Sequence, residues 1–154
     1  MNAPITYRPF DPDKDYEMLL SWWRGHNALP WPKAVLPRGL IAVGSGVDMA
    51  ASFIYLTPDQ VAVIELTTTN PKVAFGRDSI LAVKGLFLAL EGEARAAGCK
   101  AIISFTKPNG SEEHILRRMG WVISLDDPGH RMSAKPLANE DKWNPPADGV
   151  IRCL

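Results

Sequence analysis

One carboxylate lies within a run of apolar and β-branched residues that is typical of a β-strand. Glu65 belongs to the run Val61–Thr69, and the alternation of a strand puts its side chain on the same face as Val61 and Val63. Partial burial raises the pKa of a carboxyl group toward the range that suits a general base. Glu65 is therefore a candidate general base, and a strand carboxylate paired with an arginine is the alternative.

A second candidate site follows directly after this strand. The loop contains Gly76, Arg77, Asp78 and Ser79, and it leads into a long apolar-faced helix that is predicted to end at Gly98. A helix N-terminus presents unpaired N–H groups and a partial positive charge, which together suit a phosphate. The alternative is that Asp78 or Ser79 only caps the helix.

The remaining groups that could do chemistry are isolated from one another. The three histidines, His26, His114 and His130, fall in separate parts of the chain, and the two cysteines, Cys99 and Cys153, have no metal-ligand spacing. No metal site is expected from this pattern.

The elements that must position these residues can be read from local patterns. We expect strands at residues 5–10, 39–43, 49–56, 61–69 and 100–105, and a closing hairpin of residues 121–124 with 131–134. A first helix is expected from Pro12 to about Gly25 and a third from Asn109 to Met119. Between them, the long helix that follows the Gly76–Ser79 loop is expected to end at Gly98. Asp11 is the expected N-cap of the first helix, and Asn109 with Glu112 resembles a capping box for the third. The proline-rich stretch 27–37 reads as a loop with room for one helical turn.

Composition limits the class of protein. The chain has 154 residues and is 46% hydrophobic, which is enough for one domain with a real core. We expect that domain over residues 1–135, followed by a tail or docking arm over 136–154. Lys plus Arg and Asp plus Glu each number 17, so no global field draws the chain to nucleic acid or to an acidic membrane. The start lacks the features of a signal peptide and no apolar run is long enough to span a bilayer, so we expect a cytoplasmic protein.

This order of elements resembles the GCN5-related N-acetyltransferase (GNAT) superfamily over nearly the whole domain. The resemblance implies an α/β (α+β) fold with a mixed central sheet of about six or seven strands flanked by helices. The double tryptophan after Tyr16, together with the stretches 55–57 and 69–71, is similar to small acetyltransferase-like proteins of tailed bacteriophages. In that case the cytoplasm would be that of the host.

The resemblance implies acetyl-CoA, or another acyl-CoA, as cofactor. In the superfamily the pantetheine arm lies against backbone of the fourth strand, here Thr67, Thr68 and Thr69. The pyrophosphate lies at the following helix start, which implies roles for four residues, Gly76, Arg77, Asp78 and Ser79. The usual Arg/Gln-x-x-Gly-x-Gly/Ala loop is not matched, because residues 72–79 hold one glycine and Asp78 adds a negative charge that Arg77 would have to offset.

A second superfamily pattern is matched in part. Asn109, Ile115 and the pair 120–121 fall on Asn-x-x-Ala-x-x-Leu-Tyr-x-x-x-Gly-Phe without a gap. The resemblance makes Asn109 a cofactor contact and lets His114 point at the thioester end of the groove, with a solvated helix face as the alternative for His114. Leu116 stands where many members carry the tyrosine that protonates the CoA thiolate, and a leucine cannot do this.

The acceptor side is indicated by aromatic residues. Of Trp22, Trp23, Trp31 and Tyr55, we assign Trp23 to the core, and the resemblance makes Trp31 and Tyr55 candidate substrate contacts. Trp31 lies between two prolines and could be a rigid platform for a flat group such as a nucleobase.

Three functions remain open from the sequence. The first is N-acyl transfer to an amine of a small molecule or macromolecule. The second is a phage accessory or binding protein that keeps the fold without catalysis. The third is a Mom-like DNA base-modifying transferase, for which the net charge gives no support. A homodimer is one option for the oligomeric state.

Overall fold

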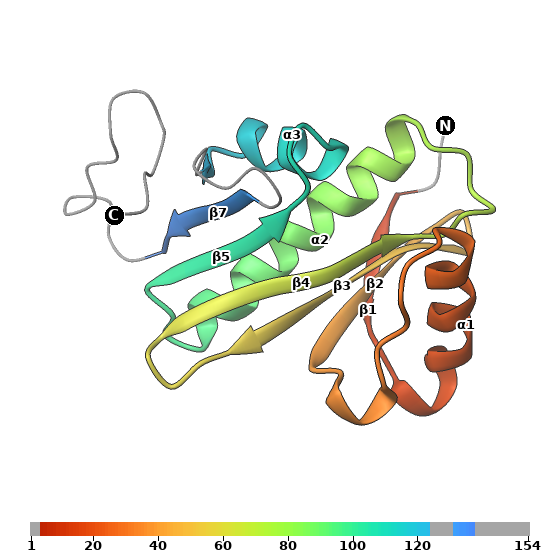
Figure 1. Cartoon of the computed structure of the whole chain (residues 1–154), viewed down its shortest axis with the longest axis horizontal. Helices are drawn as coiled ribbons and strands as arrows, with labels where there is room; N and C mark the ends of the chain where they lie inside the picture. The colour runs from red at the N-terminus through yellow and green to blue at the C-terminus, as the bar shows by residue number, and fades with distance from the viewer. Residues whose placement is uncertain (1–3, 124–130, 138–154) are drawn as a thin grey trace. The chain divides into compact units, whose positions relative to one another are not determined.

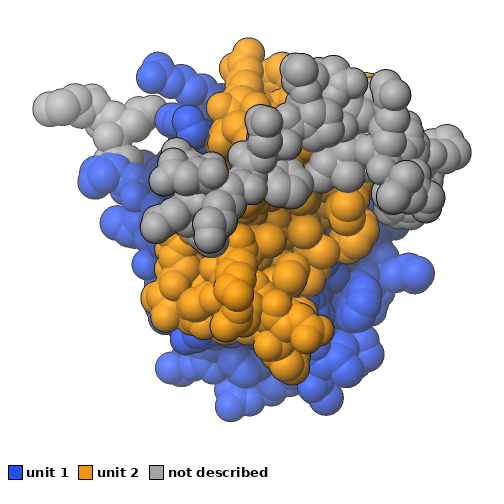
Figure 2. All heavy atoms as spheres, turned by 90° about the vertical axis from the view of Figure 1, so that its left-hand side faces the viewer, with its two compact units in different colours: residues 1–55, 65–90 blue, residues 56–64, 91–154 orange. Residues whose placement is uncertain are grey.

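The computed structural model describes residues 4–123 and 131–137, and the chain divides into two compact units, coloured separately in Figure 2. Unit 1 is Met1–Tyr55 with Glu65–Leu90, and unit 2 is Leu56–Ile64 with Glu91–Leu154. The fourth strand and the second helix each contribute residues to both units.

In the part of the chain that is described, seven strands form one mixed sheet in the order β1-β2-β3-β4-β5-β7-β6 (Figure 1). The strands are β1 (Thr6–Pro9), β2 (Arg38–Gly44), β3 (Val47–Leu56), β4 (Val61–Thr69), β5 (Ala101–Thr106), β6 (Val122–Ile123) and β7 (Arg131–Pro136). The helices are α1 (Pro12–Gly25), α2 (Arg77–Ala96) and α3 (Ser111–Arg118), with a 3-10 turn at Lys33–Val35 inside the proline-rich loop. The predicted mixed sheet flanked by helices is confirmed.

The strands of unit 1 carry helices on both faces. Arg8 of β1 binds Asp15 of α1, whereas its neighbour Tyr7 lies directly against Gly85 of α2. Successive residues of a strand point to opposite faces, so α1 and the first half of α2 cover opposite faces of this part of the sheet (Figure 1). The antiparallel pairing of β1 with β2 and of β2 with β3 holds these faces in register.

Helix α1 begins as predicted and is anchored by its tryptophans. The Asp11 side chain accepts a hydrogen bond from the Asp13 amide at 3.0 Å, as an N-cap does. Trp22 and Trp23 are 3% and 4% exposed and form one core cluster with four further residues, Leu19, Ile41, Ala51 and Phe53. Trp23 is in the core as predicted, and Trp22, which was grouped with the acceptor-side aromatics, is buried there as well.

Unit 2 is organised by two ladders and one buried carboxylate. Val61–Ile64 of β4 pairs in parallel with β5, and β7 pairs antiparallel with both β5 and β6, which confirms the predicted hairpin strands. The predicted turn of that hairpin, residues 126–129, lies outside the described residues. Glu91 of α2 is 6% exposed and binds Arg95 at 3.1 Å and Lys135 at 3.0 Å.

The start of α3 differs from the prediction. Gly110, not Asn109, is the N-cap residue, and it makes no side-chain cap hydrogen bond. Asn109 instead has a left-handed φ of 58°, which asparagine tolerates better than most residues, and its amide donates to Glu113 Oε2 at 3.0 Å. The capping box of Asn109 with Glu112 is therefore wrong: the carboxylate that reaches back belongs to Glu113.

The end of the sheet reaches into the segment that was assigned to the tail. Pro136 closes β7, and Leu137 is buried, with its amide donating to the Lys100 carbonyl at 2.7 Å. Residues 138–154 lie outside the described residues. Among the helices that are described, none is long and apolar enough to cross a membrane.

Candidate functional site

Strand β4 contains a conformational outlier next to the candidate base. Leu66 has a φ of 60°, which is unusual for a bulky non-glycine residue and costs about 1–3 kcal/mol. Before it, buried Ala62 and Ile64 alternate with half-buried residues, and after it the next buried side chain is Thr68. Strain of this kind is retained mainly where a site needs it, so the middle of β4 is a candidate functional segment.

Glu65 immediately precedes this outlier. Its side chain is half-buried, like those of Val61 and Val63, as the alternation predicted. Burial raises the pKa of Tyr55, and the nearby negative charge of Glu65 raises it further. The Tyr55 hydroxyl therefore stays protonated at neutral pH and is available as a hydrogen-bond donor near the carboxylate.

The second half of β4 is held by side chains from other elements of unit 1. The hydroxyl groups of Thr67 and Ser52 lie 2.9 Å apart, within hydrogen-bond distance. His26, just after α1, has its Nε2 atom 2.8 Å from the carbonyl oxygen of Thr69 and 3.2 Å from its hydroxyl oxygen. His26 therefore contacts the end of β4. Of the predicted cofactor residues of this strand, Thr67 and Thr69 are thus held by contacts from β3 and from the residue after α1.

The loop from β4 to α2 is fixed at its beginning and open at its end. The Asn70 side chain donates to the Asp48 carbonyl at 2.9 Å and accepts from the Lys72 amide at 2.9 Å. At Gly76 an added β-carbon would meet no atom within 4 Å, so the backbone there faces open space. Arg77 is the first residue of α2.

Of the residues predicted at the start of α2, Ser79 behaves differently from the rest. Arg77 and Asp78 are exposed, whereas Ser79 is 3% exposed and its hydroxyl donates to the Ala74 carbonyl at 3.2 Å. That bond occupies the hydroxyl proton in holding the loop. It is a different role from capping, in which the side-chain oxygen accepts from an amide.

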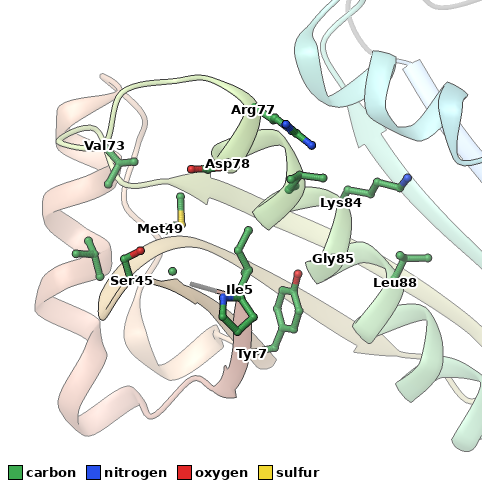
Figure 3. A pocket seen from close by; sticks show the side chains of 14 residues that line it. Ile5, Tyr7, Ser45, Met49, Val73, Arg77, Asp78, Lys84, Gly85 and Leu88 are labelled. Atoms are coloured by element: carbon green, nitrogen blue, oxygen red, sulfur yellow. The ribbon is translucent and has the colours of Figure 1, made fainter. Parts of the chain in front are cut away.

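Arg77 and Asp78 also line a cavity of about 800 Å³ in unit 1, drawn in Figure 3. The cavity lies between β1, the hairpin of β2 and β3, and the first turns of α2. Its lining does not include Glu65 or Tyr55. The sequence signal for this cavity is Gly85, a glycine inside a helix, which often marks a close contact.

Asn109 and His114 belong to unit 2. The His114 side chain is exposed on α3. Leu116, at the position of the superfamily tyrosine, is fully buried, so it belongs to the core and carries no hydroxyl group. Within the described residues, no group of His, Cys, Asp and Glu has the arrangement of a metal site.

The proline-rich loop presents an apolar surface. Trp31 is 46% exposed, and its backbone carbonyl accepts a hydrogen bond from the Tyr16 hydroxyl at 2.8 Å. Leu29 and Val35 of the same loop are exposed as well. The indole of Trp31 is therefore accessible on an anchored backbone, as a substrate contact requires.

Comparison with known proteins gives a match at the level of structure. No family model and no curated protein matches the chain. A GNAT superfamily phosphinothricin acetyltransferase from Sinorhizobium meliloti, solved in complex with AcCoA, superposes with a TM-score of 0.70 at 14% identity, covering 93% of this chain and 94% of that one. The chain has the GNAT fold.

Two further solved structures agree. The ribosomal-protein-S18-alanine N-acetyltransferase from Escherichia coli matches with a TM-score of 0.62 at 14% identity, covering 92% of this chain and 100% of that one. An N-acetyltransferase from Staphylococcus aureus Mu50 matches with a TM-score of 0.65 at 10% identity, over 88% and 99% of the two chains. The predicted GNAT fold is confirmed.

Proposed function

We propose that the chain is an acyl-CoA-dependent N-acyltransferase that moves an acyl group to an amine. The observation that carries the proposal is the strained residue Leu66 on β4, which is followed along the chain by a helix start whose backbone faces open space at Gly76. Both features lie in a fold that also occurs in an acetyltransferase solved with AcCoA.

The start of α2 has space and a positive charge for a phosphate-bearing cofactor, but it also carries a negative charge that disfavours one. Open space at Gly76 lets a pyrophosphate approach the first amides of α2, and Arg77 supplies a positive charge there. Asp78 in the first turn supplies the opposite charge, so Arg77 must offset it. We assign the pyrophosphate to residues 76–79, the pantetheine to the backbone of residues 67–69, and a further contact to Asn109.

When bound, acyl-CoA supplies the activated acyl group as a thioester. The task of the protein is to present an amine in its neutral form, because an ammonium has no lone pair with which to attack. Glu65, whose side chain is half-buried on β4, takes that proton directly or through a water molecule. His114, whose imidazole is exposed on α3, is the second candidate for proton transfer.

The acceptor amine is proposed to bind near Trp31 and Tyr55. The Tyr55 hydroxyl donates a hydrogen bond to an acceptor group, and the exposed indole of Trp31 covers an apolar or flat part of the substrate. A leaving thiolate must take its proton from water or from a group other than residue 116.

A binding protein without catalysis is the second candidate, and one observation favours it. The superfamily tyrosine position is occupied by Leu116, which is fully buried in unit 2 and cannot donate a proton. In this case the chain, phage-encoded or not, keeps the fold and uses the exposed Trp31 loop to hold a partner.

A thermal-shift titration with CoA and acetyl-CoA tests the cofactor. A ligand present at about 100 times its dissociation constant adds about 2.7 kcal/mol of stability, which raises the midpoint by several degrees. The absence of any shift at millimolar acetyl-CoA would remove the acyltransferase proposal.

Variants separate the two candidate functions. Glu65→Gln should lower amine-dependent release of CoA by about 10²-fold or more and leave acetyl-CoA affinity nearly unchanged. The matched control is Glu17→Gln on the exposed side of α1, which should keep full activity. Full activity in Glu65→Gln would exclude Glu65 as the base, and cofactor binding without turnover on any amine would favour the binding protein.

A further inference from the structure

The cavity of unit 1 has the size and lining of a small-molecule site. Its volume of about 800 Å³ lies within the roughly 300–1,000 Å³ that is typical of ligand pockets. Most of its lining side chains are apolar. They come from the residue before β1, from β3, from the loop between β4 and α2, and from α2: Ile5, Val47, Met49, Val73, Leu81 and Leu88. Leu81 and Leu88 are 43% and 52% exposed, so this lining is open to solvent.

Gly85 allows the Tyr7 hydroxyl to line the cavity next to α2. A β-carbon at this position would lie 1.6 Å from the Tyr7 hydroxyl oxygen, so only glycine lets the phenol reach the helix backbone. A glycine inside a helix is destabilising relative to alanine. Figure 3 shows the Tyr7 hydroxyl pointing toward α2 at Gly85. Burial raises the pKa of Tyr7, so this hydroxyl stays protonated and can donate.

The charges around the cavity are arranged unevenly. Figure 3 shows the side chains of Arg77 and Lys84 extending from the same side of α2, whereas the Asp78 carboxylate points the other way. Within the described parts of the chain, neither Arg77 nor Lys84 forms an ion pair or a side-chain hydrogen bond. Lys84 lies about two helical turns beyond Asp78, close to Gly85.

We propose that this cavity binds a small amphipathic monoanion, with its apolar body against Leu81 and Leu88 and its carboxylate at Lys84. A carboxylate beside Lys84 accepts a hydrogen bond from the Tyr7 hydroxyl and forms an ion pair with the Lys84 ammonium. The mostly apolar lining favours an anion with an apolar tail over a compact polar anion. The cavity shares Arg77 and Asp78 with the helix start assigned to the cofactor, but its proposed headgroup contacts, Lys84 and Tyr7, have no part in the proposed acyl transfer.

The test is a titration of the full chain at pH 7 with decanoate, followed through the amide signals of Gly44 and Gly85 in ¹H–¹⁵N spectra. The comparison probes are decyltrimethylammonium, octyl glucoside and acetate, each kept below its micelle concentration. Saturable shifts with decanoate, at an affinity at least tenfold above that of the other three probes, are expected. Equal affinity for the cationic or neutral amphiphile would overturn the proposal, and so would competition by acetate at the same concentration.

Variants test which residues contact the carboxylate of decanoate and which contact its apolar chain. Lys84→Gln should weaken decanoate at least fivefold and Tyr7→Phe about threefold, whereas Arg24→Gln on α1 removes a positive charge away from the cavity and should change nothing. Leu81→Asp should abolish binding, and Leu88→Ser serves in its place if the first variant unfolds. Unchanged decanoate affinity in Lys84→Gln would overturn the assignment. Binding confined to anionic lipid vesicles, with none to monomeric decanoate, would overturn it as well.

Discussion

Helices α2 and α3 both follow a loop that leaves a strand, yet their first turns are built differently. At α3 the loop is closed: a β-carbon on Gly110 would lie 3.3 Å from the Lys107 carbonyl, and the Asn109 amide is taken by Glu113. At α2 the loop is open, since a β-carbon on Gly76 would meet nothing within 4 Å. The start of α2 belongs to unit 1 and the start of α3 to unit 2.

Helix α1 repeats the arrangement of α3. Asp15 Oδ2 accepts from the Asp11 amide at 2.8 Å, as Glu113 Oε2 accepts from the Asn109 amide at 3.0 Å. Each carboxylate is buried, and each also pairs with an arginine, Arg8 in the one case and Arg117 in the other. In α1 and α3 a side chain of the helix itself occupies the positive end of the helix dipole.

The difference suggests how this fold separates structure from binding. A helix start that is satisfied by its own carboxylate contributes stability and offers little to a ligand. The start of α2, with Gly76 facing open space, leaves room for an anion from outside. We therefore expect changes at the first kind of start to alter folding, and changes at the second to alter cofactor affinity.

The largest effect is expected at the closed start of α3. Glu113→Ala should lower the free energy of unfolding by about 2 kcal/mol, because it removes a charge-assisted hydrogen bond to a backbone amide along with the pair to Arg117. Urea denaturation measures this loss. Glu113→Gln keeps an acceptor for the Asn109 amide and should recover about half of it. If both variants are as stable as the parent, the carboxylate does not hold this start.

The open start of α2 should respond in binding instead. Gly76→Glu places a negative side chain where an anion would lie, so acetyl-CoA affinity should fall about tenfold, which corresponds to about 1.4 kcal/mol. Stability should change by less than about 0.5 kcal/mol, because the position is open. Gly92→Glu on the exposed side of α2 adds the same charge elsewhere and is the control. A large loss of stability in Gly76→Glu would show that the backbone at Gly76 does not face open space.

Acid should weaken the closed start of α1. Burial alone would raise the pKa of Asp15, but hydrogen bonds from Arg8 and from the Asp11 amide, with the charge of Arg8, lower it overall. A carboxyl whose folded pKa is lowered contributes stability above its unfolded pKa near 3.9, and that contribution is lost as the pH falls through the lower folded value.

The corresponding variant is Asp15→Asn. It should be less stable than the parent by about 1 kcal/mol at pH 6, and the difference should shrink steadily below about pH 4. Urea denaturation from pH 6 to pH 2.5 follows this, with Asp13→Asn on the exposed side of α1 as the reference. A constant difference over the whole range would show that the charge of Asp15 is unimportant.

The smallest effect is expected at Asp78. Asp78→Asn removes a negative charge from the first turn of α2, so acetyl-CoA should bind two- to threefold more tightly, about 0.5 kcal/mol. Isothermal titration measures this, and Asp59→Asn in an exposed turn is the reference. Weaker binding in Asp78→Asn would place the cofactor charge away from this helix start.

Local patterns were sufficient to predict the elements, and the resemblance of their order to the GNAT superfamily predicted the fold. The strand and helix bounds follow from periodicity, and Asp11 was correctly recognised as an N-cap because capping depends on residues next to it in sequence. Asn109 was misassigned for an instructive reason. Its side chain suits a cap, but it also suits a left-handed backbone, and the loop from Lys107 to Gly110 uses the second property.

The candidate site was predicted less completely. Glu65, Arg77 and Trp31 were named from residue type, position and the family resemblance; Glu65 is half-buried and the other two are exposed, and their roles stay predictions. Leu66 could not be found in this way, since a leucine in a strand gives no sign of a positive φ. The contact of His26 with Thr69 joins residues that are far apart in sequence.

The sequence by itself determined the order of strands and helices, the absence of net charge and the residues able to exchange protons, because these depend on composition and on neighbours within a few positions. Only the tertiary structure decided which helix start is open, why Gly85 lies inside a helix, and that Arg77 and Lys84 flank a cavity. These features arise from contacts such as that of Tyr7 with Gly85, which form only when β1 and α2 pack together.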